Sequence, residues 1–262
     1  PNRTLEMIPA IVQTCRECRL WAQPKPQNQI STASVPEGFN ENVECDILFY
    51  RTYMAFHFIC RGSKFHAGKR IDDKEEGTLL DGIFTVWIYV HGAPKNLYFD
   101  GEGGLNTERV KNALKREGCE AKPRAPGQHP RHIDRRSATI RVSMHIAEEQ
   151  AKRESVEISF DRLLASSIFA GNAMTTVGQA TPYQVVFGRQ PAMLPALELP
   201  GYPQGDSEDG RKEARVREIA MSSMIQATAM TRTVRALKSR TSLAGRGLYK
   251  EGDLIDYHRP SH

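Results

Sequence analysis

The sequence predicts an α/β fold built around a mixed β-sheet. Three apolar runs with short links follow one another over residues 43–71, a pattern typical of an antiparallel meander. Helix and strand patterns then alternate, as they do in folds whose helices cover the faces of a sheet. Hydrophobic residues are 39% and charged residues 26% of the 262 residues, which is typical of a globular domain.

The meander begins at Val43–Tyr50, a dense apolar run with one acid, Asp46, in its middle. Such a run predicts a buried strand. The second strand is Tyr53–Cys60, and the third is Ser63–Ile71, after a turn at Arg61-Gly62.

A helix and a fourth strand are expected after the meander. Asp72-Asp73 supplies an N-cap, and apolar residues recur at helical spacing over residues 79–90. Gly92 and Pro94 end this helix. A strand then runs to Asp100, where a glycine-rich turn begins.

The next segment predicts a helix, a short strand and a loop. Thr107 is the expected N-cap of a helix that stops at Gly118. A short strand follows near Cys119–Lys122. Residues 123–130 are too rich in Pro and Gly for regular structure, so they predict a loop.

Two further helices are expected, a long one from about Arg131 to Ala151 and another over about Phe160–Ala173. Apolar and small residues at helical spacing predict which side of the long helix faces inward. This inward stripe consists of Ile133, Ser137, Ile140, Met144, Ala147 and Ala151.

Two segments rich in Pro and polar residues, 22–40 and 195–210, predict linkers on either side of a core at 41–194. Residues 211–262 are expected to form a basic helix and the start of a small β module. Between 211 and 260 there are 11 Lys and Arg against 5 Asp and Glu, a net charge of +6. Such a tail is typical of a nucleic-acid-binding surface or of a solvated arginine-rich helix.

The lengths of the apolar runs and the number of cysteines bear on two further questions: whether the chain spans a membrane, and in which cellular compartment it is expected. No apolar run approaches the roughly 18 residues that a transmembrane helix needs. Five cysteines, an odd number in a long chain, favour a reducing compartment over a disulfide framework. We therefore expect an intracellular or nuclear protein.

Three carboxylates on three different elements are candidate metal ligands. Asp46 lies inside an apolar strand, where an unpaired carboxylate is costly. Asp100 ends another strand, and Asp134 lies in the first turn of the long helix. Oxygen ligands of this kind suit Mg²⁺ or Mn²⁺. From spacing alone, each acid is also open to a structural role, such as a turn residue or a charge favoured by the helix dipole.

A resemblance to one family is carried by five features of the sequence. The features are CRECRLWAQPKP at 15–26, Asp46 in its apolar strand, KNLYFDGEGGL at 95–105, RAPGQHPRHIDRRSATIRVSMH at 124–145 and GNAMTTVGQATPYQVVFGRQPAMLP at 171–195. Together they resemble the integrase of copia-type LTR retrotransposons, part of a Pol polyprotein in the retroviral integrase superfamily. The last two are the most specific. YKEGDLIDYHRP at 249–260 weakly resembles the start of the family's C-terminal DNA-binding module.

The resemblance implies an RNase H-like core with a mixed five-stranded sheet flanked by helices. It also implies an Asp, Asp, Glu triad that binds two divalent ions, Mg²⁺ or Mn²⁺, and carries out 3′-end processing and strand transfer of DNA. By position the triad is Asp46, Asp100 and Asp134, with 33 residues between the second and the third. The implied partners are element-end and target DNA and further copies of the chain, with no membrane and no small-molecule substrate.

The third acid departs from the family pattern, because Asp134 stands where the family has Glu. Asp is shorter by one methylene, roughly 1.5 Å of reach. Ligands of such sites are held to within about half an ångström. The departure leaves two alternatives open: a degenerate DNA-binding relic without chemistry, and an RNase H-like nuclease that cuts without joining.

Residues 1–21 resemble the remnant of an N-terminal zinc-binding module. Cys15 and Cys18 match the Cys half of a His, His, Cys, Cys site. A closed tetrahedral zinc site needs four ligands. Zn²⁺ is therefore expected only if a His pair from a longer chain completes the site.

Basic residues near the third acid are candidates for contacts with DNA. Such contacts would give salt-dependent binding that is largely independent of sequence, while a solvated or ion-paired side chain is the alternative for each residue. The candidates are Lys122, Arg124 and His129 before the third acid, and Arg131, Arg135 and Arg136 beside it.

Overall fold

The computed structural model describes residues 38–100, 104–124, 131–176, 179–193 and 208–238. The chain divides into two compact units, of which the larger covers residues 34–228. The smaller unit consists of residues 1–33 and 229–262, and only 229–238 of it are described, as the last turns of a helix. The expected zinc ligands Cys15 and Cys18 and the expected β module therefore lie outside the described residues.

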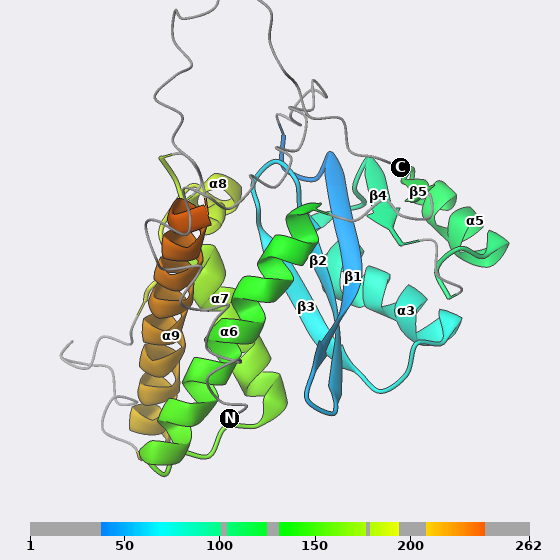
Figure 1. The fold of residues 1–262 in the computed structure, drawn as a ribbon. Coiled ribbons are helices and arrows are strands. Elements are labelled where there is room, and N and C mark those ends of the chain that lie inside the picture. Colours follow the sequence, from blue (N-terminus) through cyan, green and yellow to red (C-terminus); the bar gives the residue numbers. More distant parts are fainter. Residues whose placement is uncertain (1–37, 101–103, 125–130, 177–178, 194–207, 239–262) are drawn as a thin grey trace, which may run out of the picture. The chain divides into compact units, whose positions relative to one another are not determined.

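The larger unit is built on five strands: β1 (Asn42–Tyr50), β2 (Tyr53–Cys60), β3 (His66–Ile71), β4 (Asn96–Phe99) and β5 (Glu120–Pro123). They form one mixed sheet in the order β3-β2-β1-β4-β5 (Figure 1). β2 is antiparallel to both β1 and β3, whereas β4 and β5 run parallel to β1. The predicted α/β class with an RNase H-like five-stranded sheet is confirmed.

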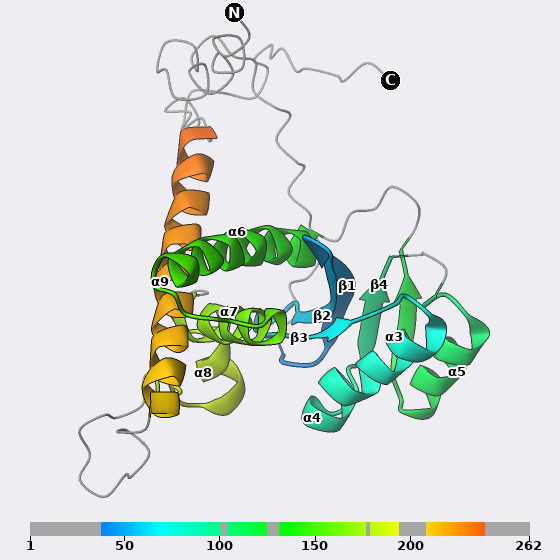
Figure 2. The ribbon, with the colours of Figure 1, turned by 90° about the horizontal axis from the view of Figure 1, so that it is seen from below.

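Helices cover both faces of this sheet, and Figure 2 shows α6 and α7 on one face and α3, α4 and α5 on the other. The helices are α3 (Glu76–Gly82), α4 (Tyr89–His91), α5 (Glu108–Arg116), α6 (Arg131–Arg153), α7 (Phe160–Met174), α8 (Pro182–Phe187) and α9 (Glu208–Lys238). None of the described helices has the length and hydrophobicity needed to cross a bilayer.

Each face of the sheet has its own hydrophobic core, because successive side chains of a strand point to opposite faces. Val43 and Cys45 of β1 belong to the core under α3 and α5. Leu48 and Tyr50 of β1 belong to the core under α6 and α7, which also takes in α9 through residues such as Ile219. By the same alternation, Glu44 and Asp46 lie on the face that α6 covers. All six residues of the expected inward stripe of α6 are buried.

The third strand begins at His66, later than the expected Ser63. Lys64 has a φ of 60°, in the left-handed region, and its N–H donates to the carbonyl of Cys60 at 2.9 Å. This backbone geometry makes a turn and cannot continue an extended strand. The β2–β3 link is therefore longer than the sequence pattern indicated.

The helix after the meander begins at Glu76, with Glu75 in the N-cap position. Asp73 contributes indirectly, since its carboxylate accepts the N–H of Glu75 at 2.9 Å. The helical segment passes through a π-helical stretch, η1 (Ile83–Ile88), which periodicity did not reveal. The predicted cap at Thr107 is confirmed, because its side chain accepts the N–H of Val110.

α8 was not expected from the sequence, although its start signal was readable. Thr181 and Gln184 form a reciprocal capping box, and Pro182 occupies the first turn. Gly188 ends the helix with a φ of 67°. This short helix belongs to the ATPYQVVFGRQP segment of the family resemblance.

Replacing Gly82 by Ala is expected to lower the free energy of unfolding by about 1–2 kcal/mol. A Cβ at Gly82 would lie 2.6 Å from Cδ1 of Phe56, which is fully buried. Gly77, in the same helix, has nothing within 4 Å of an added Cβ, so Gly77→Ala is the control and should stabilise by up to about 1 kcal/mol. Urea denaturation of both variants measures the difference, and equal shifts would contradict the close packing on Phe56.

Candidate active site

Asp46 is the central carboxylate of the candidate site. It lies in the middle of β1, half-buried, on the face that α6 covers. Burial raises the pKa of Asp46 to about 6; a hydrogen bond from the backbone of Ile47 opposes this, and the charges of Asp134 and Asp100 raise it further. The carboxylates of Asp100 and Asp134 are therefore close enough to Asp46 to disfavour its ionised form.

The sheet register explains why Asp100 meets Asp46. β4 is parallel to β1, and Tyr98 is the register partner of Glu44. Two residues further along each strand, Asp100 is level with Asp46 and on the same side of the sheet. Asp100 is exposed and directly follows β4. The strand ends thus bring together two acids that are 54 positions apart in the sequence.

Asp134 reaches the same place from the other layer. It is exposed and lies in the first turn of α6, beside the fully buried Ile133. A carboxylate in this position is favoured by the helix dipole. The charge of Asp134 contributes to the raised pKa of Asp46, so the two carboxylates lie within range of each other's charge.

Glu44 is a further polar residue of this neighbourhood that the sequence analysis missed. Its side chain is only 1% exposed. One oxygen accepts the N–H of Ile133 at 3.0 Å, and the other accepts Arg61 Nε at 2.6 Å. Burial alone would raise the pKa of Glu44, but the charges of Arg124 and Arg61, with the Ile133 N–H, outweigh burial and lower it. Glu44, on β1, is therefore an ionised carboxylate that contacts the start of α6.

The sequence-predicted DNA contacts divide into exposed and buried residues. Lys122 and Arg135 have side chains that solvent reaches, and Lys122 pairs with Glu120 at 3.1 Å. Arg124, by contrast, is 9% exposed, and its Nη2 lies 2.8 Å from Glu44. Its angle does not suit a hydrogen bond, so the contact is an ion pair. His129 and the side chain of Arg131 lie outside the described residues.

Arg136 is also directed into the protein, and it is 8% exposed. Its guanidinium donates weakly to Thr175 at 3.4 Å and to Asn172 at 3.5 Å. Burial lowers the pKa of Arg136 to about 10. Gly171 leaves the necessary space, since a Cβ there would lie 2.5 Å from Arg136 Nη2. Arg136 therefore joins α6 to α7 and does not present its charge to solvent.

The turn between β2 and β3 supplies basic residues that the sequence analysis did not single out. Lys64 Nζ lies 3.1 Å from His132 Nδ1 on α6 and also donates to the carbonyl of Arg61. Burial lowers the pKa of Lys64 and that of His132, and the neighbouring charges of Arg61 and Arg135 contribute to both shifts. The charge of Glu44 opposes both shifts, so this carboxylate already offsets part of the repulsion among the basic groups at the start of α6.

A buried polar chain runs beneath the acids, from α6 into the sheet. Ser137 Oγ lies 3.2 Å from His57 Nε2, and His57 Nδ1 lies 2.9 Å from His66 Nε2. His66 Nδ1 is buried without a hydrogen-bond partner among the described residues. We assign the proton of His66 to Nε2, because an unpaired acceptor is tolerated better than an unpaired N–H. His66 then donates to His57, and His57 donates to Ser137.

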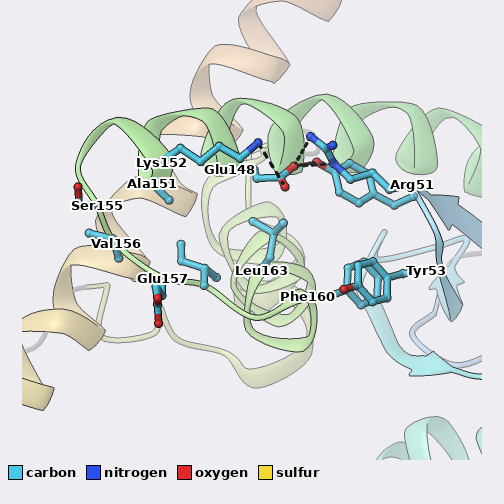
Figure 3. A pocket seen from close by; sticks show the side chains of 12 residues that line it. Arg51, Tyr53, Glu148, Ala151, Lys152, Ser155, Val156, Glu157, Phe160 and Leu163 are labelled. Atoms are coloured by element: carbon cyan, nitrogen blue, oxygen red, sulfur yellow. Dashed lines mark hydrogen bonds and ion pairs between the residues drawn. The ribbon is translucent and has the colours of Figure 1, made fainter.

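A pocket of about 460 Å³ lies at the opposite end of α6 and contains none of the three acids (Figure 3). Glu148 closes one side by accepting Tyr50 Oη at 2.8 Å and Arg51 Nε at 2.9 Å. The ring of Phe160 stacks on Tyr53 with centroids 4.5 Å apart. The polar side chains of Tyr50, Arg51 and Glu148 hydrogen-bond to one another. Because none of the three acids lines the pocket, it is separate from the carboxylate site.

The three acids suit a divalent cation in chemistry but do not form a ready-made cluster. Carboxylate oxygens are the ligands of Mg²⁺ and Mn²⁺, and a cation would favour the ionised form of Asp46, whose pKa is raised by burial first and by the charges of Asp134 and Asp100 second. Within the described ranges, however, no group of three or more His, Cys, Asp or Glu side chains is close enough together to hold an ion. Ion binding requires these carboxylates to approach one another more closely than they do here.

Comparison with known proteins identifies the fold. The sequence matches no protein-family model and no curated protein. The structure is similar to a chain of the simian T-cell lymphotropic virus intasome in complex with PP2A regulatory subunit B56 gamma. That pair has 16% sequence identity and a TM-score of 0.51, over 71% of this chain and 67% of the other.

Two integrase catalytic core domains are similar at lower scores. The HTLV-2 core solved with magnesium in dimeric form has 9% identity and a TM-score of 0.47, over 58% of this chain and 98% of the other. The BIV core has 13% identity and a TM-score of 0.48, over 57% and 95%. At 16% identity the likeness to the intasome chain concerns the fold alone, and it agrees with the RNase H-like arrangement of the five-stranded sheet.

Proposed function

We propose that this chain is the catalytic core of a retrotransposon integrase of the copia type, a metal-dependent polynucleotidyl transferase acting on DNA. The observation that supports the proposal is the strand register, which sets Asp46 and Asp100 level on neighbouring parallel strands of the sheet, on the face covered by the helix whose first turn carries Asp134. The reaction would be attack of water or a DNA 3′-hydroxyl on a phosphodiester, with release of a 3′-oxygen.

The three acids would share the binding of divalent cations. Asp46, half-buried and central, would contribute to the binding of each ion, with Asp100 on the strand side and Asp134 on the helix side. Such ions, when bound, stabilise the attacking and leaving oxygens of a phosphodiester displacement. The side chain of Asp134 is shorter than the Glu that the family pattern has at this position, so we expect weaker ion binding on the helix side of the site.

Exposed basic residues around the acids would bind the DNA backbone. Lys122 and Arg135 remain from the sequence-predicted set, and the partly buried Lys64 and His132 lie beside them at the start of α6. Contacts of this kind position the phosphate chain without reading the base sequence. Further copies of the chain, as an oligomer around two DNA ends, are part of the same proposal.

One observation favours a second candidate function, a DNA-binding relic without chemistry. The described residues contain no ready-made cluster of three metal ligands, and the third acid is the shorter Asp134. A relic would keep the fold and the basic surface but would join no DNA. The two candidates differ in catalysis alone, so an activity assay separates them.

The decisive experiment is a DNA-joining and nicking assay with Mg²⁺ or Mn²⁺, using end-mimicking duplexes and a supercoiled plasmid as target. Native chain is expected to join DNA, Asp100→Asn to lose joining, and Asp134→Glu to retain or increase it. Asp81→Asn is the control, because Asp81 pairs with Lys69 on the other side of the sheet. Nicking without joining would indicate a nuclease. An inactive native chain that gains activity with Asp134→Glu would indicate the relic.

A further inference from the structure

A single buried carboxylate contacts the elements that carry all three candidate acids. Glu44 lies two residues before Asp46 on β1, on the same side of the sheet. It accepts the N–H of Ile133, the residue that precedes Asp134 on α6, at 3.0 Å. This one side chain therefore joins the strand of the first acid to the helix turn of the third.

Two arginines extend the connection to the strand of the second acid. Arg61 donates to Glu44, and its guanidinium carbon lies 3.8 Å from the ring centroid of Tyr98. Tyr98 is the register partner of Glu44 and lies two residues before Asp100. Arg124 pairs with Glu44, and its backbone N–H donates to the carbonyl of Phe99 at 3.0 Å.

The ionic cluster of Glu44, Arg61 and Arg124 fixes the relative positions of the elements that it joins. A carboxylate that is 1% exposed is costly to bury, and the two cations and one backbone N–H that contact it offset that cost. An apolar cluster of the same volume would hold these elements together at least as well. A buried ionic cluster fixes directions in addition, because each hydrogen bond specifies an angle as well as a distance.

We propose that Glu44 is a positioning residue of the candidate active site. It holds the first turn of α6 and the end of β4 in fixed relation to β1, and so sets the separations among Asp46, Asp100 and Asp134. Its oxygens are occupied by protein donors, so it touches neither DNA nor the reacting atoms. The catalytic consequence rests on the proposed function, whereas the anchoring of α6 does not.

The test is Glu44→Gln in the full chain, with two readouts. Hydrogen exchange of amides in the first turn of α6, around Ile133, is measured without metal or DNA and is expected to speed up about tenfold, since the charge-assisted bond to the Ile133 N–H becomes at best a weaker neutral one. In the joining assay, kcat is expected to fall about 10–100-fold, as for other residues that orient ligands from outside the site. The KM for DNA is expected to stay within about twofold because Glu44 is buried.

Glu148→Gln is the matched control. Glu148 is also on α6 and also accepts from an arginine, Arg51, and from a second donor, Tyr50, but it lies at the pocket end of the helix. Exchange around Ile133 and kcat are both expected to be unchanged in this variant. The double variant Glu44→Gln with Arg124→Gln removes one charge of each sign, so it serves if the single variant fails to fold.

The outcomes separate this inference from the proposed function. Unchanged exchange around Ile133 in a folded Glu44→Gln chain would overturn the inference, whatever the activity. Unchanged kcat, or a rise in KM in place of a fall in kcat, would overturn the positioning role in an active chain. A native chain without joining activity would contradict the proposed function alone. The hydrogen-exchange measurement around Ile133 would still decide whether Glu44 anchors α6.

Discussion

Replacing Asp46 by Asn is expected to abolish DNA joining and to stabilise the folded chain at neutral pH. The folded-state pKa of Asp46 is about 6, raised from 3.8 chiefly by burial. A raised carboxyl pKa means that the folded chain binds the proton more tightly than the unfolded chain does. The contribution of Asp46 is therefore most favourable below about pH 4 and is lost as the pH rises through 6.

At pH 7 the ionised Asp46 carboxylate costs the fold about 1–3 kcal/mol, after allowance for its partial exposure. Asn has the same shape without the charge, so Asp46→Asn should raise the free energy of unfolding by that amount. Urea denaturation at pH 7 and pH 4, with a chelator present, measures the effect. The gain should shrink to below about 1 kcal/mol at pH 4, where Asp46 is protonated in the folded state and partly protonated in the unfolded state.

Asp81→Asn provides the contrast for this measurement. Asp81 is exposed and pairs with Lys69 at 2.6 Å. Removing an exposed ion pair of this kind is expected to destabilise slightly, by about 0–1 kcal/mol. Stabilisation by both variants would mean that net charge, and not the site, is responsible. Destabilisation by Asp46→Asn at pH 7 would contradict the cost of holding the ionised Asp46 carboxylate in a half-buried position.

A stabilising change that removes activity is the signature of a site whose residues are placed for chemistry at the expense of the fold. Asp46 is a half-buried acid beside two others, an arrangement that no structural role requires. Glu44, two residues earlier on the same strand, is also buried, but it is compensated by Arg61 and by Arg124. The two positions thus differ in how far the protein compensates the charge: two arginines contact Glu44, whereas the charge of Arg141 offsets the burial of Asp46 only in part.

Much of the fold could be predicted because its signals are local. The inward stripe of α6 and the cap at Thr107 are patterns within single elements, and both are confirmed. The predicted start of β3 was wrong, because a hydrophobic pattern does not report the left-handed backbone conformation at Lys64. The capping box at Thr181 and Gln184 was a readable signal for α8 that the analysis did not use.

The candidate site was predicted less completely, for a physical reason. Glu44 takes its role from Arg124 and Ile133, which are 80 and 89 positions away in the sequence, and no local pattern reports such contacts. Arg136 is different, because its burial could have been foreseen. It lies three residues after Ile133 and four before Ile140, so helical periodicity places it on the inward side of α6.

Acid is expected to destabilise this protein through the buried His57 and His66. Burial, followed by the charge of Arg141, lowers the pKa of His57 from 6.5 to about 3. Burial also lowers the pKa of His66 well below its usual range, with contributions from His57 and Arg136. A base with a lowered folded-state pKa stabilises the fold fully above pH 6.5, and this contribution is lost as the pH falls toward 3.

The size of the effect is best measured as a difference in slope. Between pH 6 and pH 4.5, His57 takes up about one proton on unfolding, which corresponds to about 1.4 kcal/mol per pH unit, and His66 contributes in the same direction. His57→Gln should therefore reduce the pH slope of the free energy of unfolding by about that much. His145→Gln, an exposed position on α6, should leave the slope unchanged.

Asp46 opposes the two histidines over the same range, because unfolding lowers its pKa and releases a proton. The native slope is consequently shallower than the histidines alone would give, and Asp46→Asn should steepen it by about 1 kcal/mol per pH unit. Denaturant titrations of native chain, His57→Gln and Asp46→Asn at four pH values measure both changes. Slopes that move in the same direction for the two variants would contradict the charge assignments at His57 and Asp46.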